Sequence, residues 1–243
     1  MRYPLEPIAT IHSPFREKFA TPRQPGLAPS VTATIKFLPG FATPEAVRGL
    51  EGFSHLWLIF LFHHNWQNGW KPTVRPPRLG GNQRIGVYAS RSPFRPNPIG
   101  LSAVKLRAIN EERGEISLEV QGADLINGTP ILDIKPYVAY GDSIPGAKSG
   151  FAAEAPDVPL KITFSEQAQQ QLDSYRTETP ELEIMLSETL TLDPRPAYRQ
   201  GKKDHQEYGV LFDRYNVHWK VTGQELMVLD IRPVLRLPAE RKG

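Results

Sequence analysis

The sequence contains no cysteine, which excludes a disulfide framework, a thiolate zinc site and a cysteine nucleophile. It also lacks long apolar runs. The longest run, Leu56 to Phe62, is too short to cross a bilayer, and the N-terminal segment has no apolar stretch typical of a secretory signal. We therefore expect a cytoplasmic protein that does not enter a membrane.

The common catalytic signatures are missing as well. There is no GxGxxG turn leading into a helix, no Walker loop and no GxSxG motif. A Rossmann-type methyltransferase would carry a glycine-rich turn after its first strand. The histidines show no zinc-like spacing, so we expect no metal site. Any nucleotide-like cofactor must then bind to a site of another kind.

Acidic residues are absent from one long block. No Asp or Glu lies between Glu51 and Glu111, where an even spread of the 26 acids would put roughly six. The same block carries eight basic residues: Lys71, Arg75, Arg78, Arg84, Arg91, Arg95, Lys105 and Arg107. A block of one sign suits a polyanion or a phosphate-bearing ligand. The alternative is a solvated basic face that acids elsewhere in the fold balance.

The segments before residue 140 favour strands. The chain is 40% hydrophobic and has 24 prolines, which fits strands and ordered loops better than long helices. Apolar alternation and β-branched residues predict strands at 6–12, 31–38, 54–62, 84–89, 101–109 and 115–121. Thr43 and Pro44 start a short helix over 43–49. We expect a mainly β fold, a barrel or a sandwich.

The composition changes after residue 140. We expect a first domain over residues 1–145, a Gly- and Pro-rich linker over 146–162 and a small α+β domain over 163–243. Helices are predicted at 163–176, where Thr163 and Glu166 would form a capping box, and at 179–190. Strand-like segments follow at 209–212, 216–222 and 226–231.

Two loops place polar groups on rigid backbones. In RSPFRPNPIG, residues 91–100, three prolines restrict the chain that displays Arg91, Arg95 and Asn97. Arginine forks on such a loop suit phosphate or carboxylate, and little entropy is lost on binding. The alternative is a rigid connector with solvated arginines. Pro22, Arg23 and Gln24 form a smaller segment of the same kind.

Three further groups lie at or near strand ends. His63 and His64 follow a buried strand, where adjacent side chains would point to opposite faces. Either one of them contacts a ligand at the end of the strand, or one is packed and the other exposed. The DLING segment at 124–128 offers a carboxylate and exposed amides, or simply a hairpin turn. Asp133, Lys135 and Tyr137 alternate along one strand face, which suits proton transfer or a surface salt-bridge row.

The motif DPRPAYR at 193–199 combines basic residues with Tyr198, and Arg199 ends it. Single-stranded RNA loops are held by such combinations of charge and stacking, although a solvated basic turn would look the same. From the residues alone, the chain is a β-rich protein that binds anions, with RNA as the favoured ligand.

Long and unusual motifs in the chain closely resemble those of the TsaA/YaeB-like family. They are PRQPGL at 22–27, AVRGLEGFSHLW at 46–57, GWKPTVRPPRLGGN at 69–82, RSPFRPNPIGLS at 91–102, DLINGTPILDIKPY at 124–137 and DPRPAYR at 193–199. They cover the first domain densely and reach into the second.

The resemblance implies a β-barrel methyltransferase that binds S-adenosylmethionine outside the Rossmann scheme and forms a homodimer. It implies a tRNA substrate that carries N6-threonylcarbamoyladenosine beside the anticodon, methylated at N6. The cofactor-contacting positions that it carries over are Pro22, Arg23, Gln24, His63, His64, Arg91, Leu101, Asp124, Leu125, Ile126 and Asn127. Asn127 stands where relatives often have Asp.

We add hypotheses for the substrate. Asp133 or Tyr137 would take the N6 proton, and Arg95 or a tail arginine such as Arg199 would clamp the threonyl carboxylate. Arg75 and Arg78 would contact the phosphates of the anticodon stem-loop. Asn97 and Tyr198, each from its own motif, are further candidates for substrate contacts. A non-catalytic RNA-binding protein and a methyltransferase for another acceptor remain as alternatives; a hydrolase is disfavoured, since no nucleophile–base pair is visible.

Overall fold

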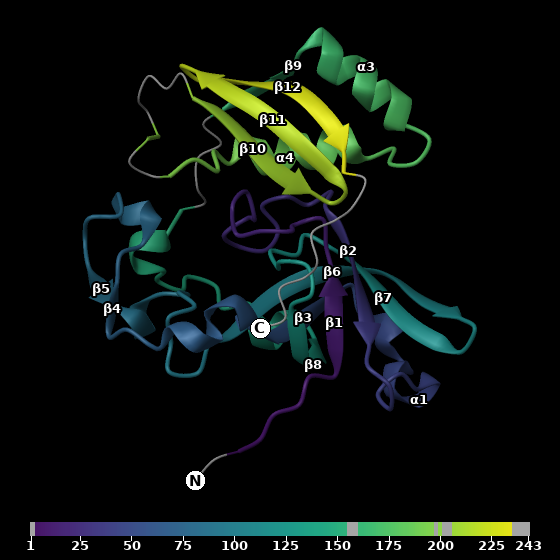
Figure 1. The fold of residues 1–243 in the computed structure, drawn as a ribbon. Coiled ribbons are helices and arrows are strands. Elements are labelled where there is room, and N and C mark those ends of the chain that lie inside the picture. The colour runs from purple at the N-terminus through teal and green to yellow at the C-terminus, as the bar shows by residue number, and fades with distance from the viewer. Residues whose placement is uncertain (1–2, 155–159, 197–198, 201–205, 235–243) are drawn as a thin grey trace.

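The computed structural model describes residues 3–154, 160–196, 199–200 and 206–234, which form a β-barrel and a smaller α+β domain (Figure 1). The smaller domain lies on one end of the barrel, with the connection between the first two strands between them. Within the described residues, no helix has the length and apolar character that a membrane span requires.

The barrel confirms the mainly β prediction. Six strands close it in the order β1-β2-β7-β6-β3-β8, and β8 returns to pair with β1. The strands are β1 (Ala9–His12), β2 (Thr32–Phe37), β3 (His55–Leu61), β6 (Ile99–Glu112), β7 (Glu115–Gln121) and β8 (Pro130–Pro136). Leu56, Leu58 and Phe60 of β3 point inward with the buried positions of its neighbours, so the strict alternation builds one apolar core.

Gly100, the last residue of the RSPFRPNPIG loop, lies on β6 where no side chain fits. A Cβ at Gly100 would lie 2.2 Å from the ring of Phe60, which occupies the space beside the backbone. Gly100 pairs with Phe60 across β6 and β3, and the ring of Phe62 stands edge-on to that of Phe60 at 5.2 Å. Only glycine lets this aromatic pair fill the end of the barrel.

Residues 62–98 leave the barrel between β3 and β6 and form a separate excursion with little regular structure (Figure 1). It contains η2 (His63–Asn68), β4 (Thr73–Val74), η3 (Pro77–Leu79), β5 (Ile85–Gly86) and η4 (Val87–Ala89). The strand expected over 84–89 is wrong beyond β5. The amide of Val87 donates to Pro72 and that of Ser90 to Val87, so the chain turns there.

The smaller domain is a four-stranded sheet in the order β10-β11-β12-β9, with two helices against it. Its elements are β9 (Lys161–Phe164), α3 (Glu166–Tyr175), α4 (Leu182–Thr191), β10 (Glu207–Phe212), β11 (Tyr215–Thr222) and β12 (Glu225–Pro233). The predicted capping box at Thr163 is wrong. Residues 161–164 pair in parallel with β12, and the hydroxyl of Ser165 caps α3 instead.

Short helices complete the chain. They are α1 (Pro44–Val47), η1 (Leu50–Gly52), α2 (Ala139–Asp142) and η5 (Gly150–Ala152). The hydroxyl of Thr43 accepts from the amide of Ala46, and Pro44 occupies the first turn, which confirms the predicted helix start.

Candidate functional site

Three segments that are far apart in the sequence meet at the barrel end that faces the smaller domain. Arg91 of the excursion donates through Nη1 to Oε1 of Gln24 at 2.6 Å. Asp124, which follows β7, accepts from the hydroxyl of Ser102 on β6 at 2.6 Å, and the charge of Arg91 acts on it. The structure thus brings together Gln24, Arg91 and Asp124, which the resemblance assigns to one site.

The carboxyl of Asp124 has an unusual environment. Burial raises the pKa of Asp124 to about 6, while the hydrogen bond from Ser102, its own backbone amide and the charge of Arg91 act to lower it. A buried carboxylate is costly unless positive charge compensates it. A cation bound beside Asp124 would favour its ionised form, and the charge state of this carboxyl changes near pH 6.

The backbone that follows Asp124 is held by the connection between β1 and β2. Ser13 donates its hydroxyl to the carbonyl of Leu125 at 2.7 Å and its amide to Oδ1 of Asn127 at 3.1 Å. The amide of Asn127 donates to Phe15, and the carbonyl of Ile126 accepts from the hydroxyl of Thr129 at 2.6 Å. The DLING segment is a turn before β8, with Gly128 at φ 75°, but it closes no hairpin, because the preceding strand β7 pairs with β2 and β6 and not with β8.

His63 and His64 begin η2 rather than continuing β3, so the argument that their side chains point to opposite faces is wrong. Their ring centroids are 4.1 Å apart. The same turn includes the buried Asn65, whose Oδ1 accepts from the ammonium of Lys18 at 2.6 Å. Among the described residues, no group of three His, Asp or Glu side chains could hold a metal ion.

Leu101 and Asp133 lie in one row on the outer surface of the barrel. Leu101 pairs with Ile59 across β6 and β3, and Ile59 pairs with Asp133 across β3 and β8. Directly paired residues share a face, and Leu101 is exposed there. Asp133 forms an ion pair with Lys135 at 2.8 Å, and the ring of Tyr137 lies 5.5 Å from that of Trp57.

The arginines of the excursion differ in their contacts. Arg95 donates Nη1 to the carbonyls of Val87 at 3.1 Å and Ser90 at 2.6 Å, so it also holds its own loop in shape. Arg78 donates to the carbonyl of Glu154. Arg75, Arg78 and Asn97 have exposed side chains, as an RNA-contacting surface requires.

The segment Pro22 to Gln24 lies next to the DPRPAYR motif. Partial burial lowers the pKa of Arg23, and the nearby carboxylate of Asp193 acts in the opposite direction. Asp193 is itself buried and binds the buried Arg195 through two hydrogen bonds, Nε at 2.8 Å and Nη2 at 2.7 Å. Arg195 therefore forms a buried ion pair, whereas the motif predicted either a basic turn that contacts RNA or a solvated one.

Pro22, Tyr198 and Arg199 are the remaining predicted residues of these two segments. Pro22 is buried, and Arg199 is half-buried, with its amide donating to the carbonyl of Pro196. Tyr198, expected to stack on RNA, lies outside the described residues.

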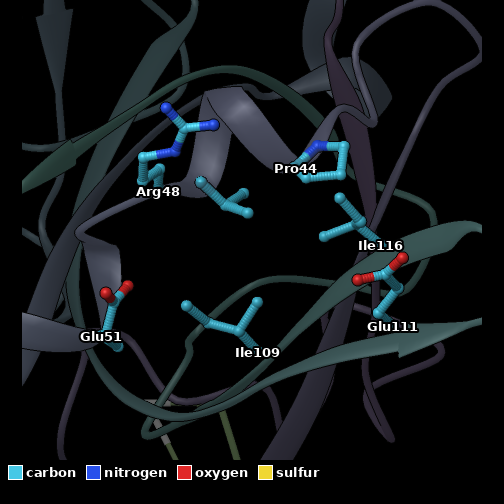
Figure 2. A pocket seen from close by; sticks show the side chains of 7 residues that line it. Pro44, Arg48, Glu51, Ile109, Glu111 and Ile116 are labelled. Carbon is cyan, nitrogen blue, oxygen red and sulfur yellow. The ribbon is translucent and has the colours of Figure 1, made fainter.

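Gln24, Arg91 and Asp124 line neither of two cavities in the described residues, although Asn127 lines the second. One of about 340 Å³ is lined by Val47, Ile109 and Ile116 with charged residues at its rim (Figure 2). Ile109 is eight residues along β6 from Leu101, roughly 26 Å at the usual rise. The other, of 530 Å³, lies between the barrel and the smaller domain, where Glu178 and Arg214 line it.

Sequence reasoning missed the residues that support the cluster. Ser102 occurs in the RSPFRPNPIGLS motif, and its position, inward-facing between Gly100 and Val104, was a detectable signal for a buried polar contact. Lys18 and Ser13 gave no comparable signal, because their partners are 47 and more than 100 residues away.

Comparisons with known proteins cover almost the whole chain. The models for the tRNA-methyltransferase O N-terminal domain and the TrmO C-terminal domain match residues 10–143 and 157–234. The chain is 43% identical to the tRNA (adenine(37)-N6)-methyltransferase of Escherichia coli, over 95% of this chain and 98% of the relative. It is 44% identical to a putative S-adenosylmethionine-dependent methyltransferase of Pseudomonas aeruginosa, over 95% and 98%. The crystal structure of TrmO from that organism matches with a TM-score of 0.80 and 37% identity, over 96% and 99% of the two chains.

Proposed function

The chain belongs to the tRNA-methyltransferase O family, and from this premise we propose that it transfers a methyl group from S-adenosylmethionine to N6 of adenine 37 in tRNA. The observation that carries the proposal is the meeting of Gln24, Arg91 and Asp124, each from a different motif, at one end of the barrel. More specifically, we propose that the substrate is tRNA in which this adenosine, beside the anticodon, carries the threonylcarbamoyl group.

The cluster fits the cofactor by charge. When bound, S-adenosylmethionine supplies an activated methyl group on a positively charged sulfur. The partly buried carboxylate of Asp124 suits a positive group, and the planar fork of Arg91 suits a carboxylate. Pro22, Arg23, His63, His64, Leu101 and the backbone of Leu125 to Asn127 would complete the site.

Proton removal is the chemical task of the protein. N6 in a threonylcarbamoyl group belongs to a urea-like system with a delocalised lone pair, so it needs to lose its proton as the new N–C bond forms. We assign this to Asp133, with Tyr137 as the other candidate, because Asp133 shares its outer row with Leu101. The proton then passes from the carboxyl to water.

Substrate selection rests on charge. Arg95 has five N–H donors, and its contacts to Val87 and Ser90 use one nitrogen, so the same group can hold the loop and meet the threonyl carboxylate. Arg75, Arg78 and Asn97 on the excursion would contact the anticodon stem-loop, with Tyr198 and Arg199 from the other domain.

The assembly and location belong to the proposal too. We expect a homodimer in the cytoplasm, with the cofactor sites near the subunit interface. We propose a first domain over residues 1–145 and a second that begins at about residue 161, because β9 (Lys161–Phe164) pairs with β12 and the limit expected at 163 falls inside that strand.

The test is methyl transfer from labelled S-adenosylmethionine to two tRNA pools, one with and one without threonylcarbamoyladenosine. Label in the modified pool alone supports the reaction and the carboxylate handle. Label in both pools supports a tRNA methyltransferase but refutes recognition through the threonyl carboxylate. Cofactor binding without label points to another acceptor, and tRNA binding without cofactor affinity points to a non-catalytic RNA-binding protein.

A further inference from the structure

The connection between β1 and β2, residues 13–31, belongs to the barrel by sequence and to the smaller domain by packing. Phe15, Ala20, Ala28 and Val31 are buried in the same apolar cluster as Trp219 and the helices of the smaller domain. The barrel core does not include them. This connection carries Pro22, Arg23 and Gln24. The smaller domain therefore packs against a segment that belongs to the cofactor cluster of the barrel.

Polar contacts fix both ends of the connection to the smaller domain. At one end, Arg16 pairs with Asp213 at 3.4 Å, and the amide of Asp213 donates to the carbonyl of Pro14. At the other end, the amide and hydroxyl of Ser30 donate to the carboxylate of Glu188 at 2.7 and 2.8 Å. The ends are therefore set by contacts across the domain boundary.

Phe19 is the aromatic anchor nearest in the sequence to residues 22–24. Its ring is nearly parallel to that of Trp219, at 6° and 6.2 Å between centroids, and lies 6.2 Å from that of Tyr208. Tyr208 and Trp219 stack on each other at 4.7 Å. Trp219 is fully buried, so the cluster offers Phe19 a rigid platform.

The polar side chains around Phe19 reach the cofactor cluster. Lys18, next to it, donates to Asn65 in the turn that begins with His63. Gln24 accepts from Arg91, which acts on Asp124. Anchoring Phe19 thus determines where three of the cofactor-binding segments meet.

We infer that the smaller domain positions the cofactor site, with Phe19 as the positioning residue that fixes residues 22–24 against Arg91. The inference rests on the proposed function, because it takes the cluster to bind S-adenosylmethionine. It assigns the smaller domain a role in cofactor binding that is separate from any contact with tRNA.

The experiment compares cofactor affinity, by calorimetry on the full chain, in the wild type, Phe19→Ala and Phe19→Tyr. Without the ring contact, a smaller fraction of molecules holds residues 22–24 in the binding conformation, so the Kd of Phe19→Ala rises about fivefold to tenfold. Phe19→Tyr keeps the ring and restores the affinity. Hydrogen exchange without ligand is faster over residues 13–31 in Phe19→Ala alone.

Leu172→Ala is the matched control. Leu172 is buried in the same apolar cluster but lies on α3, whereas the ring contacts of Phe19 are with Tyr208 on β10 and Trp219 on β11. It should lower the unfolding temperature and leave the Kd unchanged. An unchanged Kd in Phe19→Ala, or an equal rise in Leu172→Ala, overturns the inference. A wild type that does not bind the cofactor overturns the proposed function instead.

Discussion

Replacing Asp124 with asparagine separates binding from stability, because the same buried charge affects them in opposite directions. With a pKa of about 6, the carboxyl is nearly all ionised at pH 7.5 and about one-tenth ionised at pH 5. If the ionised form holds the cationic cofactor, wild-type affinity falls about tenfold across that range. Asp124→Asn binds weakly at pH 7.5 and shows no such slope.

The effect on stability follows from the raised pKa. Between the ordinary value of 3.8 and about 6, the folded protein holds a proton that the unfolded chain has released. The free energy of unfolding therefore falls as pH rises through this window and stays lower above it, by on the order of 3 kcal/mol. Asp124→Asn removes this loss, so the variant should be more stable than the wild type at pH 7.5.

Calorimetric titration from pH 5 to 7.5 and urea unfolding at the same values test both effects. Asp173→Asn, which changes an exposed carboxylate paired with Arg176 on α3, is the control and should alter neither. A variant that binds the cofactor as tightly as the wild type at pH 7.5 would refute the assignment of Asp124 to the positive group.

Three other substitutions test separate steps. Gly100→Ala forces a Cβ against the ring of Phe60 and should lower the free energy of unfolding by about 1–3 kcal/mol in urea, whereas Gly86→Ala, with open space, should not; equal midpoints would contradict the packing argument. Asp133→Asn should reduce kcat by about 100-fold with unchanged cofactor Kd, and a retained kcat would exclude it as the proton acceptor. Arg95→Lys keeps the charge without the fork, so the preference for the modified tRNA pool should fall about tenfold in label transfer; an unchanged preference would remove the clamp.

Local signals in the sequence predicted most elements, and the reasons are visible in the structure. The apolar alternation of β3 reports a strand with one face in the core, and Thr43-Pro44 reports a helix start, because both depend on near neighbours. The helix start predicted at Thr163 was wrong, because residues 161–164 form a strand by pairing with β12, more than 60 residues later in the chain. Closure of the barrel was also beyond local patterns.

The candidate site was predictable only as a set of motifs. Arg91 and Asp124 were singled out by their loops, but their distance, the burial of Asp124 and its partner Ser102 depend on the closed barrel. Arg195 was read as basic surface, and its burial against Asp193 depends on a domain that the motif does not describe. Charge patterns identify which groups are present and not which are buried.

The contact between Arg16 and Asp213 joins residues 197 positions apart, and it has a consequence for how the molecule is made. During synthesis, Phe15 and Phe19 emerge long before the strands that cover them, so nascent chains expose an apolar segment until β10 and β11 are complete. Late, long-range contacts of this kind slow folding. A ribosome stalled before residue 207 would therefore carry a barrel whose first connection is a binding site for chaperones.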